Sequence, residues 1–167
     1  MQSTESSSME TENVIIRRLR PSDLEAVISI DAKATGSRRV EYFKIKLEMA
    51  RNETGVEVSL AAEIDEMFVG FVIARVYYGD FGIAESSATL EVLGVHPDFR
   101  GRGIGHGLLR QLTTNLLALG VGKVSTEVTW DDTRMIAFMQ REGFAPAPRF
   151  CIDLDCEAFR QREETRI

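Results

Sequence analysis

The chain has 167 residues, of which 44% are hydrophobic and 28% charged, a composition typical of a globular protein with one core. Its 26 acidic residues outnumber 20 basic ones, and the resulting net charge of −6 disfavours nucleic acid as a partner, because a phosphate backbone would be repelled. The apolar run Met67 to Ala74 is far shorter than the roughly 20 residues that a membrane helix needs. The sequence therefore predicts a single domain without a membrane partner.

The N-terminal residues are rich in Ser, Glu and Thr and lack the basic start and apolar stretch of a secretory signal. Cys151 and Cys156 would face opposite sides of one extended segment, which disfavours a disulfide between them. Both features fit a cytoplasmic location. The expected organisation is a disordered tail over residues 1–12, a folded domain over 13–156 and a C-terminal tail over 157–167.

The first part of the chain predicts a strand followed by two short helices. Val14 to Leu19 is β-branched and apolar, and the spacing of Ser22 and Glu25 is that of a helix capping box. Apolar residues then recur at helical spacing on both sides of a Gly36-Ser37 break. These residues are Leu24, Val27 and Ile28 before the break and Val40, Phe43 and Leu47 after it.

From Val56 the apolar residues alternate, which is the pattern of strands. Asp65-Glu66 predicts a turn between two strands of a hairpin, the second of which is Met67 to Tyr78. A third strand-like run, Ala88 to Val95, ends at His96-Pro97, because proline disfavours a continued ladder.

The clearest element is a helix in which Ile104 and four leucines, at 108, 112, 116 and 119, repeat at helical spacing until Gly120. We expect a strand over Lys123 to Thr129 next, then a helix that Asp131 or Asp132 caps and Gly143-Phe144 ends. A last strand would carry the alternating residues Phe150, Ile152 and Leu154. This order predicts an α/β fold with a mixed sheet and helices on its faces.

The turn before the leucine-rich helix carries four glycines between Gly101 and Gly107. Each glycine costs a helix start about 1 kcal/mol, so bare backbone is needed there. Exposed amides at a helix N-terminus bind anions, and Arg100 and Arg102 add positive charge. The turn therefore predicts a phosphate or pyrophosphate site.

Two common nucleotide loops do not fit this spacing. A dinucleotide fingerprint starting at Gly103 would need glycine where Leu108 stands, and one starting at Gly101 meets His106. A Walker loop starting at Gly101 would need Gly-Lys where His106-Gly107 stands. His96 and His106 have no Cys, Asp or Glu cluster at metal spacing, so no metal is expected.

The sequence Arg100-Gly101-Arg102-Gly103-Ile104-Gly105 resembles the acyl-CoA motif Arg/Gln-x-x-Gly-x-Gly/Ala of the GNAT superfamily of N-acetyltransferases. Leu93 to Pro97 is similar to the strand and exit that precede this motif in the family, and Glu127 to Phe144 is similar to its later strand, helix and Gly-Phe stop. The resemblance covers most of the chain. It implies an acyl-CoA N-acyltransferase-like fold, with a mostly antiparallel sheet splayed between its fourth and fifth strands and flanked by about four helices.

The resemblance also implies the residues that hold acetyl-CoA, which would be the co-substrate. The backbone of the fourth strand would hold the acyl carbonyl and the pantetheine arm, the amides of Arg102 to Gly105 would hold the pyrophosphate, and His106 and Asp132 would border the cofactor. The complete cofactor set is Leu93, Gly94, Val95, Arg100, Gly101, Arg102, Gly103, Ile104, Gly105, His106 and Asp132.

Acyl transfer to an amine needs a base that accepts the proton of an ammonium group. Glu91 is the first candidate, because it lies two residues from Leu93 and is expected on the same strand face. Glu127, on the next strand, is the second. Many family members have a tyrosine where Met139 stands and an asparagine where Asp132 stands, and methionine cannot protonate the departing thiolate. Asp132 is also a candidate helix cap.

We therefore expect an acetyl-CoA-dependent N-acetyltransferase that acts on a primary amine of a small molecule or of a protein or peptide. The alternative is a non-catalytic acyl-CoA-binding sensor or scaffold of the same fold, which the missing tyrosine keeps open. Transfer to a hydroxyl is a third alternative. The sequence leaves the acceptor and the oligomeric state open, with a homodimer as one alternative.

Overall fold

The computed structural model describes residues 13–52, 58–78 and 85–165, so the N-terminal tail expected over residues 1–12 lies outside the described residues. The chain divides into two compact units, Met1–Thr129 and Trp130–Ile167. The sheet belongs to the first unit, and the two C-terminal helices belong to the second. No described helix is long and apolar enough to cross a membrane.

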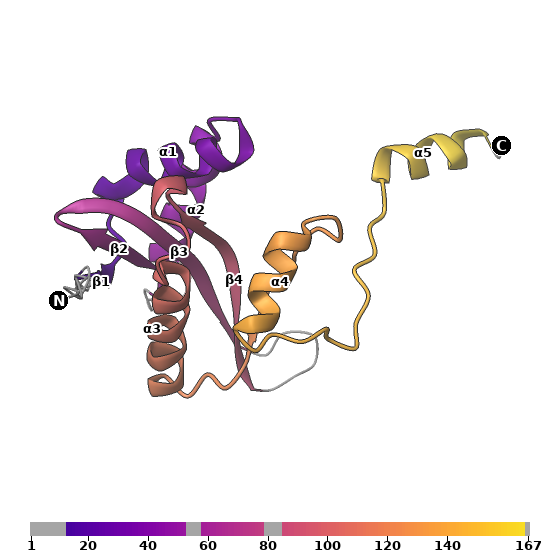
Figure 1. Cartoon of the computed structure of the whole chain (residues 1–167). Coiled ribbons are helices and arrows are strands. Elements are labelled where there is room, and N and C mark those ends of the chain that lie inside the picture. The colour runs from indigo at the N-terminus through magenta and orange to yellow at the C-terminus, as the bar shows by residue number, and fades with distance from the viewer. Residues whose placement is uncertain (1–12, 53–57, 79–84, 166–167) are drawn as a thin grey trace, which may run out of the picture. The chain divides into compact units, whose positions relative to one another are not determined.

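The first unit is built on a five-stranded sheet with the strand order β1-β2-β3-β4-β5. Figure 1 labels the first four of these strands. All neighbours pair antiparallel except β4 and β5, which pair parallel. This arrangement confirms the predicted mixed, mostly antiparallel sheet. The strands are β1 (Ile15–Arg18), β2 (Leu60–Ile64), β3 (Met67–Tyr78), β4 (Ser86–Val95) and β5 (Val124–Ser125).

The hairpin between β2 and β3 turns at Asp65 and Glu66, as the sequence predicts. Both residues have positive φ angles, 48° and 63°, which match the right-handed twist of a two-residue hairpin turn. Residues 79–84 lie outside the described residues, and β4 begins at Ser86, two residues before the predicted Ala88.

Two helices, α1 (Leu24–Thr35) and α2 (Val40–Asn52), cover one face of the sheet (Figure 1). Gly36, with a φ of 75°, ends α1, so the break predicted at this glycine is confirmed. The capping box predicted from Ser22 and Glu25 is wrong, because a 3-10 turn, η1 (Pro21–Asp23), precedes the helix. The core on this face consists of Leu19, Val27, Ile28, Ile30, Phe43, Ala61, Phe71 and Ile73.

The opposite face of the sheet packs against α3 (Ile104–Ala118). A Cβ built on Gly70 of β3 would lie 3.0 Å from Ile104 and 3.3 Å from Leu108, so glycine lets the helix approach the strand closely. Leu112 and Leu116 are also buried, whereas Leu119 is exposed beyond the helix end. Gly120, with a φ of 74°, follows that end as predicted.

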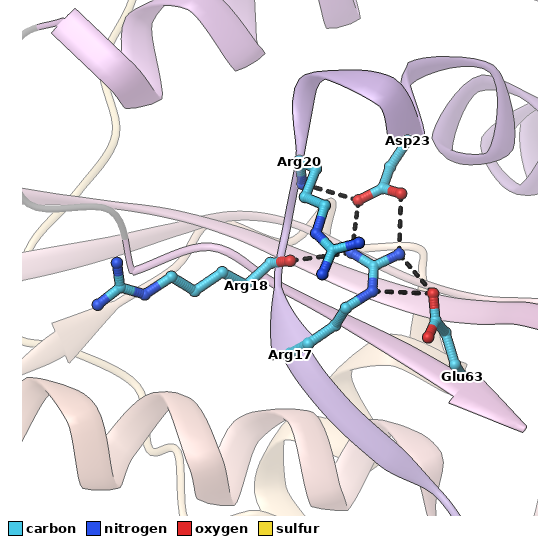
Figure 2. Close-up of polar contacts among 5 residues, drawn as sticks. All are labelled: Arg17, Arg18, Arg20, Asp23 and Glu63. Carbon is cyan, nitrogen blue, oxygen red and sulfur yellow. Dashed lines mark hydrogen bonds and ion pairs between the residues drawn. The ribbon is translucent and has the colours of Figure 1, made fainter. Parts of the chain in front are cut away.

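An ion cluster formed by Arg17, Asp23 and Glu63 fastens the start of the first unit (Figure 2). Arg17 of β1 donates from Nη1 and Nη2 to the two oxygens of Asp23 at 2.7 and 2.9 Å, and from Nε to Glu63 of β2 at 2.8 Å. The Arg20 amide donates to Asp23 at 2.7 Å. Burial alone raises the pKa of Asp23, but these hydrogen bonds and the nearby positive charges hold it below its usual range.

The second unit contains α4 (Thr133–Arg141) and α5 (Cys156–Thr165). Gly143 has a φ of 91° and Phe144 donates its amide to the Met139 carbonyl, so the predicted Gly-Phe stop is confirmed. The last strand predicted around Phe150 to Leu154 is not formed. Residues 157–165 of the predicted C-terminal tail belong to α5.

Candidate active site

The sheet opens between β4 and β5. Only Ala88 with Val124 and Thr89 with Ser125 pair across these strands, and Thr126 adds a side-chain hydrogen bond of 2.9 Å to the Leu90 carbonyl. The strand predicted over Lys123 to Thr129 is therefore confined to β5. Beyond Leu90, the edge of β4 that faces away from β3 has no neighbouring strand among the described residues. The splay predicted between the fourth and fifth strands is confirmed, and it leaves the backbone edge of residues 91–95 without a strand partner in the described part of the chain.

The glycine-rich turn connects this open strand to α3. A short 3-10 turn, η3 (Pro97–Phe99), follows β4 and is capped by His96. Gly101 and Gly103 then adopt φ angles of 78° and 77°, a conformation that favours glycine over residues with a Cβ. A Cβ on either glycine would meet nothing within 4 Å, so the backbone angle rather than crowding calls for glycine here.

The first turn of α3 presents amides to an anion. Gly107 donates its amide to the Gly103 carbonyl at 2.9 Å, which is the first hydrogen bond of the helix. The amides of Ile104 and Gly105 precede that bond and so have no partner within the helix. Partial positive charge collects at this end of a helix, so the turn can bind a phosphate group.

Both arginines of the turn are exposed and fold back over it. Arg100 donates from Nε to the Val95 carbonyl at 3.3 Å, and Arg102 donates from Nη2 to the Asp98 carbonyl at 3.3 Å. The Arg102 guanidinium also lies over the Phe99 ring, 4.8 Å from its centroid. These contacts keep two positive charges beside the start of α3, as the sequence leads us to expect.

Glu91 lies on the other face of the sheet from Leu93, so the expectation that the two residues share a face is wrong. The register between β3 and β4 shifts at this point: Val92 pairs with Ile73, whereas Leu90 pairs with Ala74. Glu91 is therefore the extra residue of a β-bulge, and bulges re-aim side chains. Its carboxylate reaches the α2 side of the sheet.

On that side Glu91 forms an ion cluster with Lys46 of α2 and Arg75 of β3. Its Oε1 lies 2.9 Å from Lys46 Nζ and 2.6 Å from Arg75 Nη2. Its Oε2 is buried and has no hydrogen-bond partner among the described residues. A buried polar atom without a partner costs about 1 to 3 kcal/mol, and more when charged. Sequence patterns did not indicate Lys46 or Arg75, because only the bulge brings Glu91 to them.

The remaining candidates occupy different surroundings. Glu127 follows β5 and is exposed, in contrast to Glu91. Within the second unit, Asp132 accepts a hydrogen bond of 3.0 Å from the Met135 amide, so Asp132 is the cap of α4 that its position predicts. Met139 is buried. No group of three or more His, Cys, Asp or Glu residues in the described parts of the chain is placed to hold a metal ion.

Comparison with known proteins identifies the family. A profile described as "Acetyltransferase (GNAT) family" matches residues 24–144, which include the sheet opening and the glycine-rich turn. The chain belongs to the GNAT acetyltransferase family. A curated relative, acetyltransferase ECA0875 of Pectobacterium atrosepticum, is 32% identical over 148 residues, which cover 89% of this chain and 98% of the relative. The family assignment makes this chain an acyltransferase.

Solved structures of GNAT enzymes share the fold. The aminoglycoside N-acetyltransferase AAC(6')-Iy, in complex with CoA, superposes with a TM-score of 0.72 at 18% identity, over 86% of this chain and 95% of that one. The ribosomal-protein-alanine N-acetyltransferase of Brucella melitensis biovar Abortus 2308 gives 0.68 at 19% identity, over 85% and 98%. At these identities the likeness shows the acyl-CoA N-acyltransferase-like architecture of the GNAT family.

Proposed function

We propose that this chain transfers the acetyl group of acetyl-CoA to a primary amine of a small molecule or of a protein or peptide. The observation that carries the proposal is the continuity of two features: the open edge of β4 leads, through the short η3 turn, into the glycine-rich turn at the start of α3. An extended thioester arm fits beside an unpaired strand edge, and a pyrophosphate fits the amides of a helix N-terminus.

The donor would be bound largely by backbone. Leu93, Gly94 and Val95 would hold the acyl carbonyl and the pantetheine arm, and the amides of residues 102–105 would hold the pyrophosphate. Arg100 and His106 border this turn and are exposed. A structural relative with CoA bound supports CoA as the carrier.

The chemical step is a direct transfer. The neutral amine nitrogen attacks the thioester carbonyl, the new C–N bond forms, the C–S bond breaks and CoA leaves as a thiolate. The proton lost from nitrogen passes to a carboxylate, for which Glu91 is the first candidate and Glu127 the second. A thiol with an ordinary pKa of about 8.5 is a tolerable leaving group, so the methionine at position 139 does not preclude turnover.

Two matched glycine variants test the donor site. Gly103 and Gly120 stand at opposite ends of α3 with φ angles of 77° and 74°, and a Cβ on either meets nothing within 4 Å. Alanine at either position should therefore cost a similar strain, about 1 to 2 kcal/mol. We expect Gly103→Ala to weaken acetyl-CoA binding at least 10-fold in calorimetry, whereas Gly120→Ala binds as the wild-type chain does. Equal affinities in the two variants would place the pyrophosphate elsewhere.

Release of free CoA thiol separates the enzyme from a binding module. Wild-type protein is incubated with acetyl-CoA and a panel of primary amines that includes a polyamine, an aminoglycoside, an amino acid and a lysine-bearing peptide. Acceleration by at least one amine supports the transferase. Tight acetyl-CoA binding without acceleration by any amine supports the non-catalytic alternative.

A further inference from the structure

The two oxygens of the Glu91 carboxylate have different surroundings. The side chain is 8% exposed, and Oε1 receives both Lys46 at 2.9 Å and Arg75 at 2.6 Å. Oε2 is buried without a hydrogen-bond donor among the residues that the structure describes. One oxygen is therefore occupied by the protein, and the other keeps lone pairs for which no described residue supplies a donor.

The cations that hold Oε1 are themselves packed in place. Lys46 and Arg75 are each 19% exposed, and each lies against a tyrosine ring. Lys46 Nζ is 5.6 Å from the centroid of Tyr42, and Arg75 Cζ is 5.3 Å from that of Tyr77. Cation–π contacts of this kind restrict where the charged group can sit. The orientation of the carboxylate thus depends on α2 and β3 as well as on the bulge in β4.

We propose that Lys46 is a positioning residue, which turns the Glu91 carboxylate so that Oε2 accepts the N–H of the acceptor amine. The inference rests on the proposed acetyl transfer and names the atom at which the amine binds. It also gives α2 a role in the reaction, because Lys46 lies on that helix. Lys46 does not contact the amine itself and acts on it only by orienting Glu91. A solvent-facing cation could not do this, since its own mobility would leave the carboxylate free to rotate.

Lys44 provides a matched control on the same helix. It is exposed and pairs with Glu41 at 2.8 Å, away from the Glu91 cluster. Methionine keeps most of the length and the apolar stem of lysine while removing its charge. Lys46→Met and Lys44→Met therefore remove the same charge from α2, and only the first removes a contact to Glu91.

The test compares kcat, the acceptor KM and the acetyl-CoA Kd with the best amine of the panel. We expect Lys46→Met to lower kcat about 10-fold while the acetyl-CoA Kd changes less than about 2-fold, and Lys44→Met to leave both within about 2-fold. Lys46→Arg should restore most of the rate, because arginine can still donate to Oε1. In a Glu91→Gln background, Lys46→Met should lower kcat little further, since both changes act through one carboxylate.

Several outcomes would overturn this inference while leaving acetyl transfer intact. These are equal rates in the two methionine variants, full additivity in the double variant, or a parallel loss of acetyl-CoA binding that signals general damage. If Lys46→Met does not fold, Lys46→Gln is read in the same way. If no amine of the panel accelerates thiol release by the wild-type chain, the proposed transfer and this inference are both overturned.

Discussion

The first unit contains two partly buried ion clusters with opposite ratios of cations to carboxylates. At β1, one arginine, Arg17, meets two carboxylates, those of Asp23 and Glu63 (Figure 2). At β4, one carboxylate, Glu91, meets two cations. Both oxygens of Asp23 accept hydrogen bonds, whereas one oxygen of Glu91 accepts none from the described residues.

This difference distinguishes a cluster that stabilises the fold from a cluster that can bind a ligand. A buried ion cluster whose polar atoms are satisfied holds elements together, and removing one member leaves an uncompensated charge. A cluster that keeps one buried oxygen open bears a cost in the folded protein, and such costs concentrate where ligands bind. We therefore expect the Arg17 cluster to control stability and the Glu91 cluster to control turnover.

Removing Arg17 should give the largest effect on stability. In Arg17→Met, Asp23 and Glu63 remain as neighbouring, partly buried carboxylates without their cation, and we expect a loss of about 3 kcal/mol in the free energy of unfolding. Urea denaturation at pH 7 measures it. The folded fraction should bind acetyl-CoA with unchanged affinity, so a loss of binding without a loss of stability would reverse the assignment of roles.

Replacing Glu91 should mainly affect turnover. We expect Glu91→Gln to lower kcat about 100-fold, the usual range for loss of a general base, with a smaller shift of the urea midpoint than Arg17→Met causes. Glu127→Gln tests the second candidate base, which is exposed and outside the cluster. If Glu127→Gln loses turnover and Glu91→Gln retains it, Glu127 is the base instead.

The parts of the fold and site that the sequence predicted are those determined by local chemistry. These are the glycine-rich turn before α3, the helix ends at Gly120 and Gly143, and the hairpin turn after Ile64. All of them follow from the backbone conformations that the local residues can adopt. The motif spacing that these glycines create also carried the family resemblance, which the family match confirmed.

Features that depend on pairing between distant segments were missed. Alternation along β4 placed Glu91 with Leu93, but the bulge opposite Ile73 and Ala74 is a property of the β3–β4 ladder and has no mark in the β4 sequence. For the same reason, the sequence pattern indicates no functional role for Lys46, which lies on α2. Phe150 and its alternating neighbours predicted a strand, yet a strand needs a partner, and alternation does not supply one.

Acid should weaken the Arg17 cluster through Asp23. Its pKa is lowered in the folded chain, so Asp23 stabilises the fold fully above its ordinary value of about 3.9, and this stabilisation is lost as the pH falls through the folded-state value. We expect Asp23→Asn to cost about 2 kcal/mol at pH 7 and progressively less below pH 4. Chemical denaturation at several pH values measures the difference, which should shrink in an Arg17→Met background.

The smallest effect is expected where an ion pair is exposed. Arg38 Nη2 lies 2.9 Å from Glu25 Oε2, which is about the distance found in the ion pairs of the two clusters. The two side chains are, however, 57% and 75% exposed. Water solvates both charges whether or not they meet, so Arg38→Ala should change the free energy of unfolding by less than about 0.5 kcal/mol. A loss as large as that of Arg17→Met would mean that distance rather than burial sets the strength of these pairs. The contrast between the clusters would then need another explanation.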